Sequence, residues 1–256
     1  MRILMIGDVI GQPGRRAIKE LVPGLRKEFA IDLVIANGEN TAGGFGITLD
    51  TAYELLDSGV DILTSGNHIW DQKEIIPHMD EGIPLLRPAN YPDAPGHGYW
   101  VQDGVMVLNL MGRVFMPALD CPFRTADAIL KEAEGPDRPR VVVVDFHAEA
   151  TSEKQGLGWY LDGRVSAVLG THTHVGTVDA RILPKGTAYL TDVGMTGPVN
   201  SVIGSGVEAV LDRFLTGMPQ RLPVASGPVM MNSVLLDIDQ DTGKALTIQR
   251  IDRMVD

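Results

Sequence analysis

The sequence predicts an α/β fold, and three features of the chain support this prediction. Apolar runs of strand length recur through about residue 170 of the 256 residues, helical patterns lie between them, and the remaining part contains hairpin-like segments. Alternation of strands and helices is typical of a largely parallel sheet with helices outside it. The C-terminal part then adds antiparallel strands, so we expect one domain over residues 1–256 with both kinds of pairing.

Six runs are expected to form the strands of the first part. Most of them are too uniformly apolar for a sheet with one face in solvent, so a sheet buried on both faces is the simplest interpretation. The runs are RILMIG at 2–7, DLVIAN at 32–37, DILTSG at 61–66, VMVLNL at 105–110, RVVVVD at 140–145 and RVSAVLG at 164–170.

Three segments between these runs carry helical patterns. Residues 15–30 place apolar side chains close to one helical face, and Pro23 is expected to kink or break that helix. Segments 48–59 and 124–135 each have a threonine near the start that could cap a helix, and each ends at a glycine. In the second of these segments the predicted cap is Thr125.

Four other segments lie outside this alternation. The pattern at 179–194 and at 229–252 is that of hairpins, the second with turn residues at DQDTGK. Residues 87–104 are rich in proline and glycine and are the best candidate for an irregular insertion or lid. The segment TDVGMTGP at 191–198 either lines a site or forms a structural turn.

Composition limits the classes of function. A net charge of −11 argues against a broad electrostatic grip on nucleic acid, whereas a small phosphorylated substrate is compatible with it if a bound metal supplies positive charge. Apolar runs such as 141–144 are too short to cross a bilayer, and Cys121 has no second cysteine to pair with. We therefore expect a cytoplasmic protein without a membrane segment. Aromatic residues around 91–100 could support a homo-oligomer.

Side chains able to bind metal or transfer protons follow five of the predicted strands. The carboxyl ends of parallel strands share one edge of a sheet, so these side chains should converge. Each alone has an ordinary explanation as a turn, cap or hydrogen-bonded residue, but five coincidences at equivalent places favour a metal site. The residues are Asp8, then Glu39 and Asn40, then Asn67 and His68, then His147, and finally His172 and His174.

The composition of this set favours two metal ions. It is rich in oxygen, has three imidazoles and lacks thiolate, which suits manganese, iron, zinc or cobalt. About seven donors exceed what one ion with an open position needs, whereas two ions that share a carboxylate would use them all. His172 and His174 would each reach a different ion from a kinked loop. Glycines that precede the donors are expected to permit sharp turns, namely Gly7, Gly38, Gly66 and Gly170.

Short motifs around these residues resemble those of a known family. GD at 7–8, GEN at 38–40, GNH at 66–68, the isolated His147 and GTHTH at 170–174 resemble, in order and spacing, the five blocks of the calcineurin-like metallophosphoesterases. More narrowly, GDVIGQPGR, NGENTAGGFG, TSGNHIWD and YLTDVGMTGP resemble the YmdB-like branch over nearly the whole chain. Ile10 stands where the wider superfamily has a histidine, and Glu39 where it has an aspartate. The branch shares both changes.

The resemblance implies a fold and a ligand set. The fold is a four-layer α/β/β/α sandwich of two mixed sheets. The site would hold two divalent or mixed-valence ions, with iron or manganese expected. Asp8, Asn40 and His174 would hold one ion, Asn67, His147 and His172 the other, and Glu39 would bridge them.

The resemblance also implies an activity. The protein would be a metal-dependent phosphodiesterase in which His68 protonates the leaving oxygen, and 2',3'-cyclic nucleotides are the expected substrates. RNA ends are a further candidate partner. A platform for the base could come from Phe45, Tyr91, Tyr99 or Trp100, although each could equally be a packing residue.

Two other functions are compatible with the same residues. A metal-dependent hydrolase of amides or esters would use the same activated water but would need a pocket for a carbonyl group. A non-catalytic metal-binding regulator would act through a partner surface, and the nearly complete ligand set argues against it.

Overall fold

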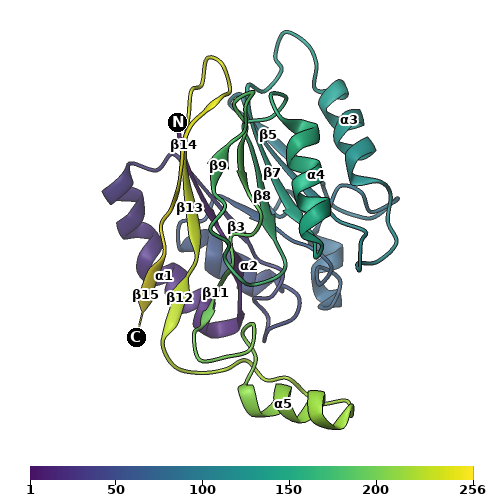
Figure 1. The fold of residues 1–256 in the computed structure, drawn as a ribbon, viewed down its shortest axis with the longest axis vertical. Helices are drawn as coiled ribbons and strands as arrows, with labels where there is room; N and C mark the ends of the chain where they lie inside the picture. The colour runs from purple at the N-terminus through teal and green to yellow at the C-terminus, as the bar shows by residue number, and fades with distance from the viewer. Residues whose placement is uncertain (256) are drawn as a thin grey trace.

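Two mixed sheets lie face to face in the computed structural model, which describes residues 1–255 (Figure 1). In the first sheet, β1 is parallel to β3, and β3 to β4, while β13 and β14 add antiparallel strands. Its order is β14 (Ala245–Arg250), β13 (Ser233–Ile238), β1 (Arg2–Ile6), β3 (Leu33–Asn37) and β4 (Ile62–Thr64).

The second sheet has a parallel centre and antiparallel edges. Strands β6, β7, β8 and β10 are parallel neighbours, and β5 and β9 close the two edges. Its order is β5 (Tyr99–Gln102), β6 (Val105–Met111), β7 (Val141–His147), β8 (Ala167–Thr171), β10 (Ala188–Leu190) and β9 (Arg181–Ile182). The β9–β10 and β13–β14 pairs confirm the two hairpins predicted from the sequence.

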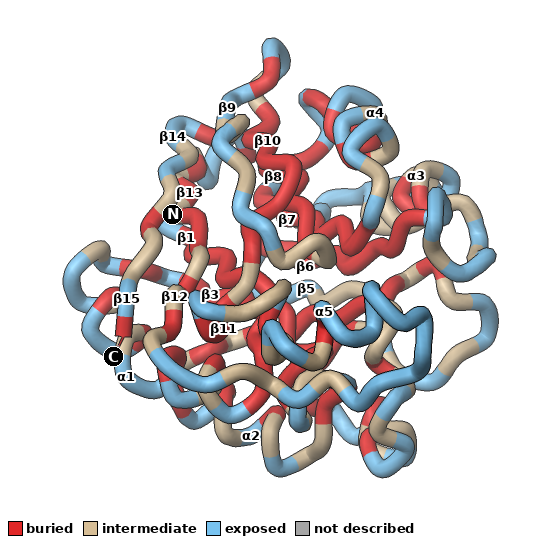
Figure 2. Tube along the Cα trace, turned by 60° about the horizontal axis from the view of Figure 1, so that its bottom comes forward, coloured by how far each residue is buried: buried red, intermediate tan, exposed pale blue. Residues whose placement is uncertain are grey.

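Helices cover the outer face of each sheet, which confirms the predicted four layers. Alternate residues of β1 belong to different apolar clusters, because Leu4 packs beneath helices α1 and α2 and Met5 packs against the second sheet. In β7, Val143 packs between the sheets and Val144 packs beneath α3 and α4. Both faces of the central strands are therefore buried, as the red tube segments in Figure 2 show. The helices are α1 (Gly11–Phe29), α2 (Leu49–Asp57), α3 (Pro122–Glu132) and α4 (Thr151–Leu161).

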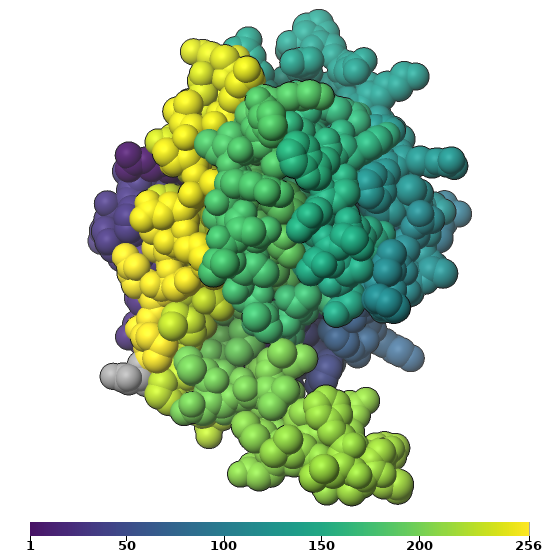
Figure 3. All heavy atoms as spheres, viewed as in Figure 1, coloured from purple at the N-terminus to yellow at the C-terminus, as the bar shows by residue number. Residues whose placement is uncertain are grey.

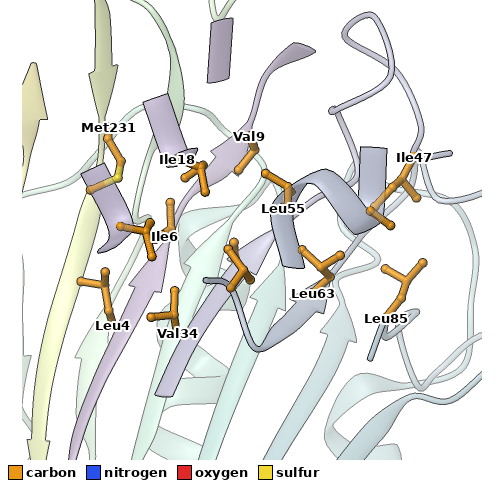
Figure 4. Close-up of a cluster of buried hydrophobic side chains, with 14 of the residues drawn as sticks. Leu4, Ile6, Val9, Ile18, Val34, Ile47, Leu55, Leu63, Leu85 and Met231 are labelled. Atoms are coloured by element: carbon orange, nitrogen blue, oxygen red, sulfur yellow. The ribbon is translucent and has the colours of Figure 1, made fainter. Parts of the chain in front are cut away.

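Figure 4 shows the cluster between the first sheet and its helices. Ile6 and Val34 lie on the strands, while Ile18 of α1 and Leu55 of α2 meet them from the helical layer. All four side chains are fully buried. Burial of each such side chain stabilises the folded state by roughly 1.5–3 kcal/mol. This cluster supports the strands that end at the candidate site.

A third, small sheet was not expected. It contains β15 (Arg253–Val255), β12 (Val229–Met231), β11 (Met195–Pro198) and β2 (Asp8–Val9). Strand β2 has only two residues and pairs in parallel with β11, so its own sequence has no periodicity that could have indicated it. The consequence is that Asp8 is held in register beside Met195.

Two helices differ from the expectations in detail. Helix α1 continues through Pro23, so the proline does not break it. Helix α3 begins at Pro122 with Cys121 at the N-cap position, four residues before the predicted cap Thr125. Proline suits the first turn of a helix because its missing N–H is not needed there. By contrast, Thr48 caps α2 as predicted, in a reciprocal pair with Thr51.

The remaining segments include one helix that stands apart from the sheets. Helix α5 (Val207–Thr216) projects beyond the body of the molecule between β11 and β12 (Figures 1 and 3). A short 3-10 helix, η1 (Lys73–His78), follows β4, and residues 87–98 form loops that lead into β5. Among residues 1–255, no helix has both the length and the apolar character needed to cross a membrane.

Candidate metal centre

The side chains singled out in the sequence come together where the carboxyl ends of the two sheets meet. Five segments contribute them: three come after β1, β3 and β4 of the first sheet, and two come at the ends of β7 and β8 of the second. Asp8 opens β2, Glu39 and Asn40 follow β3, Asn67 and His68 follow β4, His147 ends β7, and His172 and His174 follow β8.

His147 is the centre of one group. Its Nε2 atom lies 3.0 Å from Oδ1 of Asn67, 3.0 Å from Oε1 of Glu39 and 3.0 Å from Nδ1 of His172. One imidazole nitrogen carries at most one proton and so cannot hydrogen-bond to all three neighbours. Glu39, His147 and His172 offer ligand atoms within 4.8 Å of one another, so a shared cation fits this group.

Asp8 is the centre of a second group. Its Oδ1 atom lies 3.6 Å from Nε2 of His174, which in turn lies 3.3 Å from Nδ2 of Asn40. That carboxylate oxygen is buried and has no hydrogen-bond partner among the described residues. Oε1 of Glu39 lies 3.5 Å from the Asn40 amide and also contacts His147, so Glu39 joins the two groups.

The buried carboxylates keep their charge because imidazoles surround them. Burial by itself would raise the pKa of Asp8, but the nearby imidazoles of His174 and His147, when charged, hold it far below its usual value. Burial likewise opposes ionisation of Glu39, and His147 lowers its pKa. In return, Asp8 raises the pKa of His174 to about 9 despite the burial of the imidazole. Burial and the neighbouring His147 lower the pKa of His172 to about 3.

These observations fit divalent cations. The site holds buried negative charge that requires positive partners, and a metal can replace protons in that role. The oxygen and imidazole donors, without thiolate, suit manganese, iron, cobalt or zinc. The unpartnered Asp8 oxygen is itself a free ligand atom.

A hydrogen-bonded chain behind His147 orients its ring. Thr171 donates its hydroxyl proton to Asp145 (2.7 Å), so the same oxygen can only accept from Nδ1 of His147 (3.0 Å). Nδ1 then carries the proton, so the lone pair of Nε2 is available to a cation held between His147 and Glu39. Burial raises the pKa of Asp145 to about 6. Such outer partners fix the tautomer of metal-binding histidines.

The loop after β8 is kinked, as predicted. His172 and His174 have φ angles of 101° and 63°, in the left-handed region that costs a non-glycine residue about 1–3 kcal/mol. A buried ion pair beneath the loop holds it in place. Lys154 of α4 donates to the carbonyl of Thr171 (2.8 Å), and its partner Asp192 accepts from the backbone N–H of Thr173 (3.2 Å).

The segment 191–198 supports the site from behind. The carbonyl of Gly194 accepts the backbone N–H of Asp8 (3.0 Å), and Asp192 braces the histidine loop. None of the residues 191–198 lines the cleft described below, so the segment has a structural role, with residues 191–194 leading into strand β11. The sequence did not indicate a role for Asp145 or Asp192. A carboxylate at the end of a uniformly apolar run is, however, a signal that could have identified Asp145.

The glycines before the donors permit close packing. A Cβ atom on Gly7 or Gly170 would lie 1.9 Å or 1.8 Å from a backbone carbonyl oxygen, and one on Gly66 would lie 2.1 Å from the His147 ring. At Gly38 the nearest side-chain atom would be 3.1 Å away. None of the four has a left-handed φ angle, so close packing and not an unusual backbone conformation requires glycine at Gly7, Gly66 and Gly170.

His68 lies beside these groups with a different set of contacts. Its backbone N–H donates to Oε2 of Glu39 (2.9 Å), and its Nδ1 atom lies 2.8 Å from Oδ2 of Asp71. The Phe45 ring meets the imidazole edge to face at 5.2 Å. The carboxylate of Asp71 therefore orients the ring of His68.

A cleft of about 500 Å³ opens over the donors. Glu39, His68 and His174 line its polar side, and an apolar wall faces them from the region around α5. Of the four aromatic residues considered as a base platform, Phe45 alone lines this cleft among the described residues. Tyr91 packs against Trp70, and the other two pack beside the second sheet. The wall consists of Val202, Ile203, Val210, Phe214, Leu222 and Val224.

A four-layer α/β/β/α sandwich with this cluster at the strand ends defines a metallophosphoesterase. The chain belongs to the YmdB-like protein family, whose model matches residues 4–251.

Known relatives agree with this assignment. The chain is 52% identical to a 2',3'-cyclic-nucleotide 2'-phosphodiesterase from Bacillus subtilis, over 98% of this chain and 96% of that protein. A crystal structure of a hypothetical protein from Thermus thermophilus matches with 47% identity and a TM-score of 0.93 over 99% of both chains. A novel phosphatase from Mycoplasma pneumoniae has 34% identity and a TM-score of 0.93 over 99% of this chain and 93% of that one.

Proposed function

We propose that this protein hydrolyses 2',3'-cyclic nucleotides with two metal ions, at the bond between phosphorus and the 2' oxygen. The broader class, a metal-dependent phosphodiesterase, follows from membership of the family. The name of the Bacillus subtilis relative supports the substrate and the bond. The observation that carries the proposal is the convergence of donors from five segments around His147 and Asp8.

We assign the ligands according to the two groups of contacts. Asp8, Asn40 and His174 would hold one ion, and Asn67, His147 and His172 the other. Glu39 would bridge them, because its Oε1 atom contacts both groups. Iron and manganese suit these oxygen and imidazole donors. Bound there, the pair would supply an activated water and positive charge for the phosphoryl oxygens.

His68 is the proposed general acid. When the bond to the 2' oxygen breaks, that oxygen needs a proton, and the imidazole lines the same cleft as the donors without sharing their central contacts. Asp71 orients the ring through Nδ1, which leaves Nε2 for the substrate. The product is then a nucleoside 3'-phosphate with a free 2' hydroxyl.

Metal analysis and a substrate panel test this proposal. Protein purified without oxygen should contain two metal ions per chain and should convert 2',3'-cyclic AMP to 3'-AMP. The panel also contains 3',5'-cyclic AMP, 3'-AMP, bis-p-nitrophenyl phosphate, and amide and ester chromogens. Turnover of the ester or amide alone would refute the phosphodiesterase, and formation of 2'-AMP would refute the assigned bond.

A further inference from the structure

A second hollow joins the cleft over the candidate metal centre. It has a volume of about 790 Å³ and shares with the cleft the residues Phe45, Arg213, Leu222 and Val224. Val224 packs against two glycines of the floor, since a Cβ on Gly44 would lie 2.9 Å from it and one on Gly11 would lie 3.1 Å from it. The two hollows therefore adjoin each other across these residues, and together they are called the groove.

The second hollow differs in charge from the rest of the molecule. The protein carries 33 acidic residues and a net charge of −11, yet no carboxylate lines this hollow among the described residues. Its charged lining residues are Arg213 and Arg221, and neither forms an ion pair with any residue that the structure describes. The nearby Asp212 carboxylate accepts from the amide of Gln220 (2.6 Å). The hollow thus offers two unpaired guanidinium groups.

Neutral polar groups complete its lining. Gln12, Gln72, Gln220 and Ser226 can donate and accept hydrogen bonds without repelling an anion. Arginine binds phosphate oxygens with two parallel hydrogen bonds, which makes it the preferred side chain for this ligand. The chemistry of the hollow is therefore that of a phosphodiester with its attached sugar or base.

The position of Phe45 indicates on which side of the reacting phosphate the nucleoside would lie. In the proposed reaction His68 protonates the ribose 2' oxygen, so the nucleoside lies on the His68 side of the reacting phosphorus. The Phe45 ring contacts His68, is 41% exposed and borders both hollows. Aromatic side chains with an exposed face are the usual stacking platforms for unpaired bases.

We infer that the groove binds the 3' end of an RNA chain that terminates in a 2',3'-cyclic phosphate, with the preceding nucleotide in the second hollow and its phosphodiester on Arg213 and Arg221. This inference rests on the proposed function and extends it from a mononucleotide to an oligonucleotide. The terminal base stacks on Phe45.

Paired substrates test the inference. The dinucleotide ApA with a terminal 2',3'-cyclic phosphate should have a kcat/KM about tenfold above that of 2',3'-cyclic AMP, mainly through a lower KM, because one stacked base and one phosphate contact are added. Raised salt should reduce this advantage, since counterion release contributes to the contact. Calorimetry with the product ApAp against 3'-AMP gives a readout that does not depend on turnover.

Arg221 provides the diagnostic variant because it lines the second hollow and not the cleft over the donors. Arg221→Gln should remove most of the dinucleotide advantage in kcat/KM and in ApAp affinity, and 2',3'-cyclic AMP should be hydrolysed as by the wild type. Arg138→Gln, another exposed arginine, is the matched control and should change neither substrate.

Two results would overturn the inference while the proposed function stands. One is equal kcat/KM for both substrates in the wild type, and the other is an unchanged dinucleotide advantage in Arg221→Gln. If the metal-loaded wild type hydrolyses neither substrate, the proposed function itself fails, and the inference fails with it.

Discussion

His68 and His78 form the same local pair in different places. Nδ1 of His68 lies 2.8 Å from Asp71, and Nδ1 of His78 lies 2.6 Å from Glu81, each three residues further along the chain. Only His68 lines the cleft over the donors. The imidazole–carboxylate pair is therefore common to both histidines, and its position relative to the metal-capable side chains distinguishes them.

This comparison supplies a matched pair of variants. His68→Ala should lower kcat on 2',3'-cyclic AMP by about 10²- to 10⁴-fold, since the leaving oxygen loses its proton donor. Metal content, measured by elemental analysis, should remain that of the wild type. His78→Ala should leave both quantities unchanged. Loss of metal together with activity in His68→Ala would instead identify His68 as a ligand.

Lys154 and Asp192 are a second residue-scale feature, because a fully buried lysine needs a compensating charge. Lys154→Met should lower the free energy of unfolding by about 3–5 kcal/mol, since it leaves Asp192 buried without its partner. Burial already raises the pKa of Asp192. Urea unfolding measures the effect, and Lys154→Met combined with Asp192→Asn should lose less. Equal stability of Lys154→Met and wild type would contradict the role of the pair.

At the scale of elements, the loops that follow the strands can approach one another closely because glycines at the contact points have no side chain. The loop after β4 meets β7 at Gly66, where any Cβ would overlap the His147 ring. The same holds for the contact of β8 with the strand-end carbonyl of Thr191 at Gly170. Glycine at these positions therefore determines how closely the donor segments approach one another.

Gly66→Ala should displace His147 and weaken metal binding by about 10-fold or more, as loss of ligand orientation does. Titration of the metal-free protein with Mn²⁺ measures this, and circular dichroism checks that the fold remains. Gly24→Ala is the control, because nothing lies within 4 Å of its Cβ position inside α1. That variant should gain about 0.5–1 kcal/mol of stability. Unchanged Mn²⁺ affinity in Gly66→Ala would disprove the packing argument.

At the scale of the whole molecule, hydrogen bonds from the C-terminal hairpin connect the segment before the small sheet with the segment after the histidine loop. Arg250 of β14 donates to the carbonyls of Val193 (2.8 Å) and Thr177 (3.2 Å) and pairs with Asp252 (2.9 Å). Asp252 also accepts from the side-chain amide of Asn232 (3.2 Å). Residues near the end of the chain thus stabilise segments that flank the donors.

The ion pair between Arg250 and Asp252 predicts a dependence of stability on pH. Burial opposes ionisation of Asp252, but hydrogen bonds from Arg250 and Asn232 and the charge of Arg250 lower its pKa below the usual 3.8. Because the pKa of Asp252 is lower in the folded protein than in the unfolded chain, the ionised carboxylate stabilises the fold at pH values above the unfolded-state pKa. This contribution is lost as the pH falls through the folded-state pKa. Asp252→Asn should therefore be less stable than wild type near pH 6, and the difference in stability should shrink as the pH falls below the usual aspartate pKa of 3.8. A gap that does not change with pH in urea unfolding would contradict this.

The sequence by itself determined the six main strands, three of the helices and the set of side chains that meet, because these depend on local patterns. Uniform apolar runs identify strands buried on two faces, and a motif directly after each run places its donor at the strand end. Helix boundaries were less certain, as Thr125 shows, because the first turn around Pro122 had no apolar periodicity.

Tertiary structure alone decided which atoms face one another. The contact of Asn37 with Asp145 joins residues 108 positions apart, and the pairing of β2 with β11 depends on two residues whose neighbours come from the far end of the chain. Buried ion pairs, orphaned oxygens and the unpaired arginines of the groove arise from the sum of such distant contacts. Each of these features depends on which polar groups are excluded from water. Burial results from the packing of the whole molecule and cannot be predicted from a short segment of sequence.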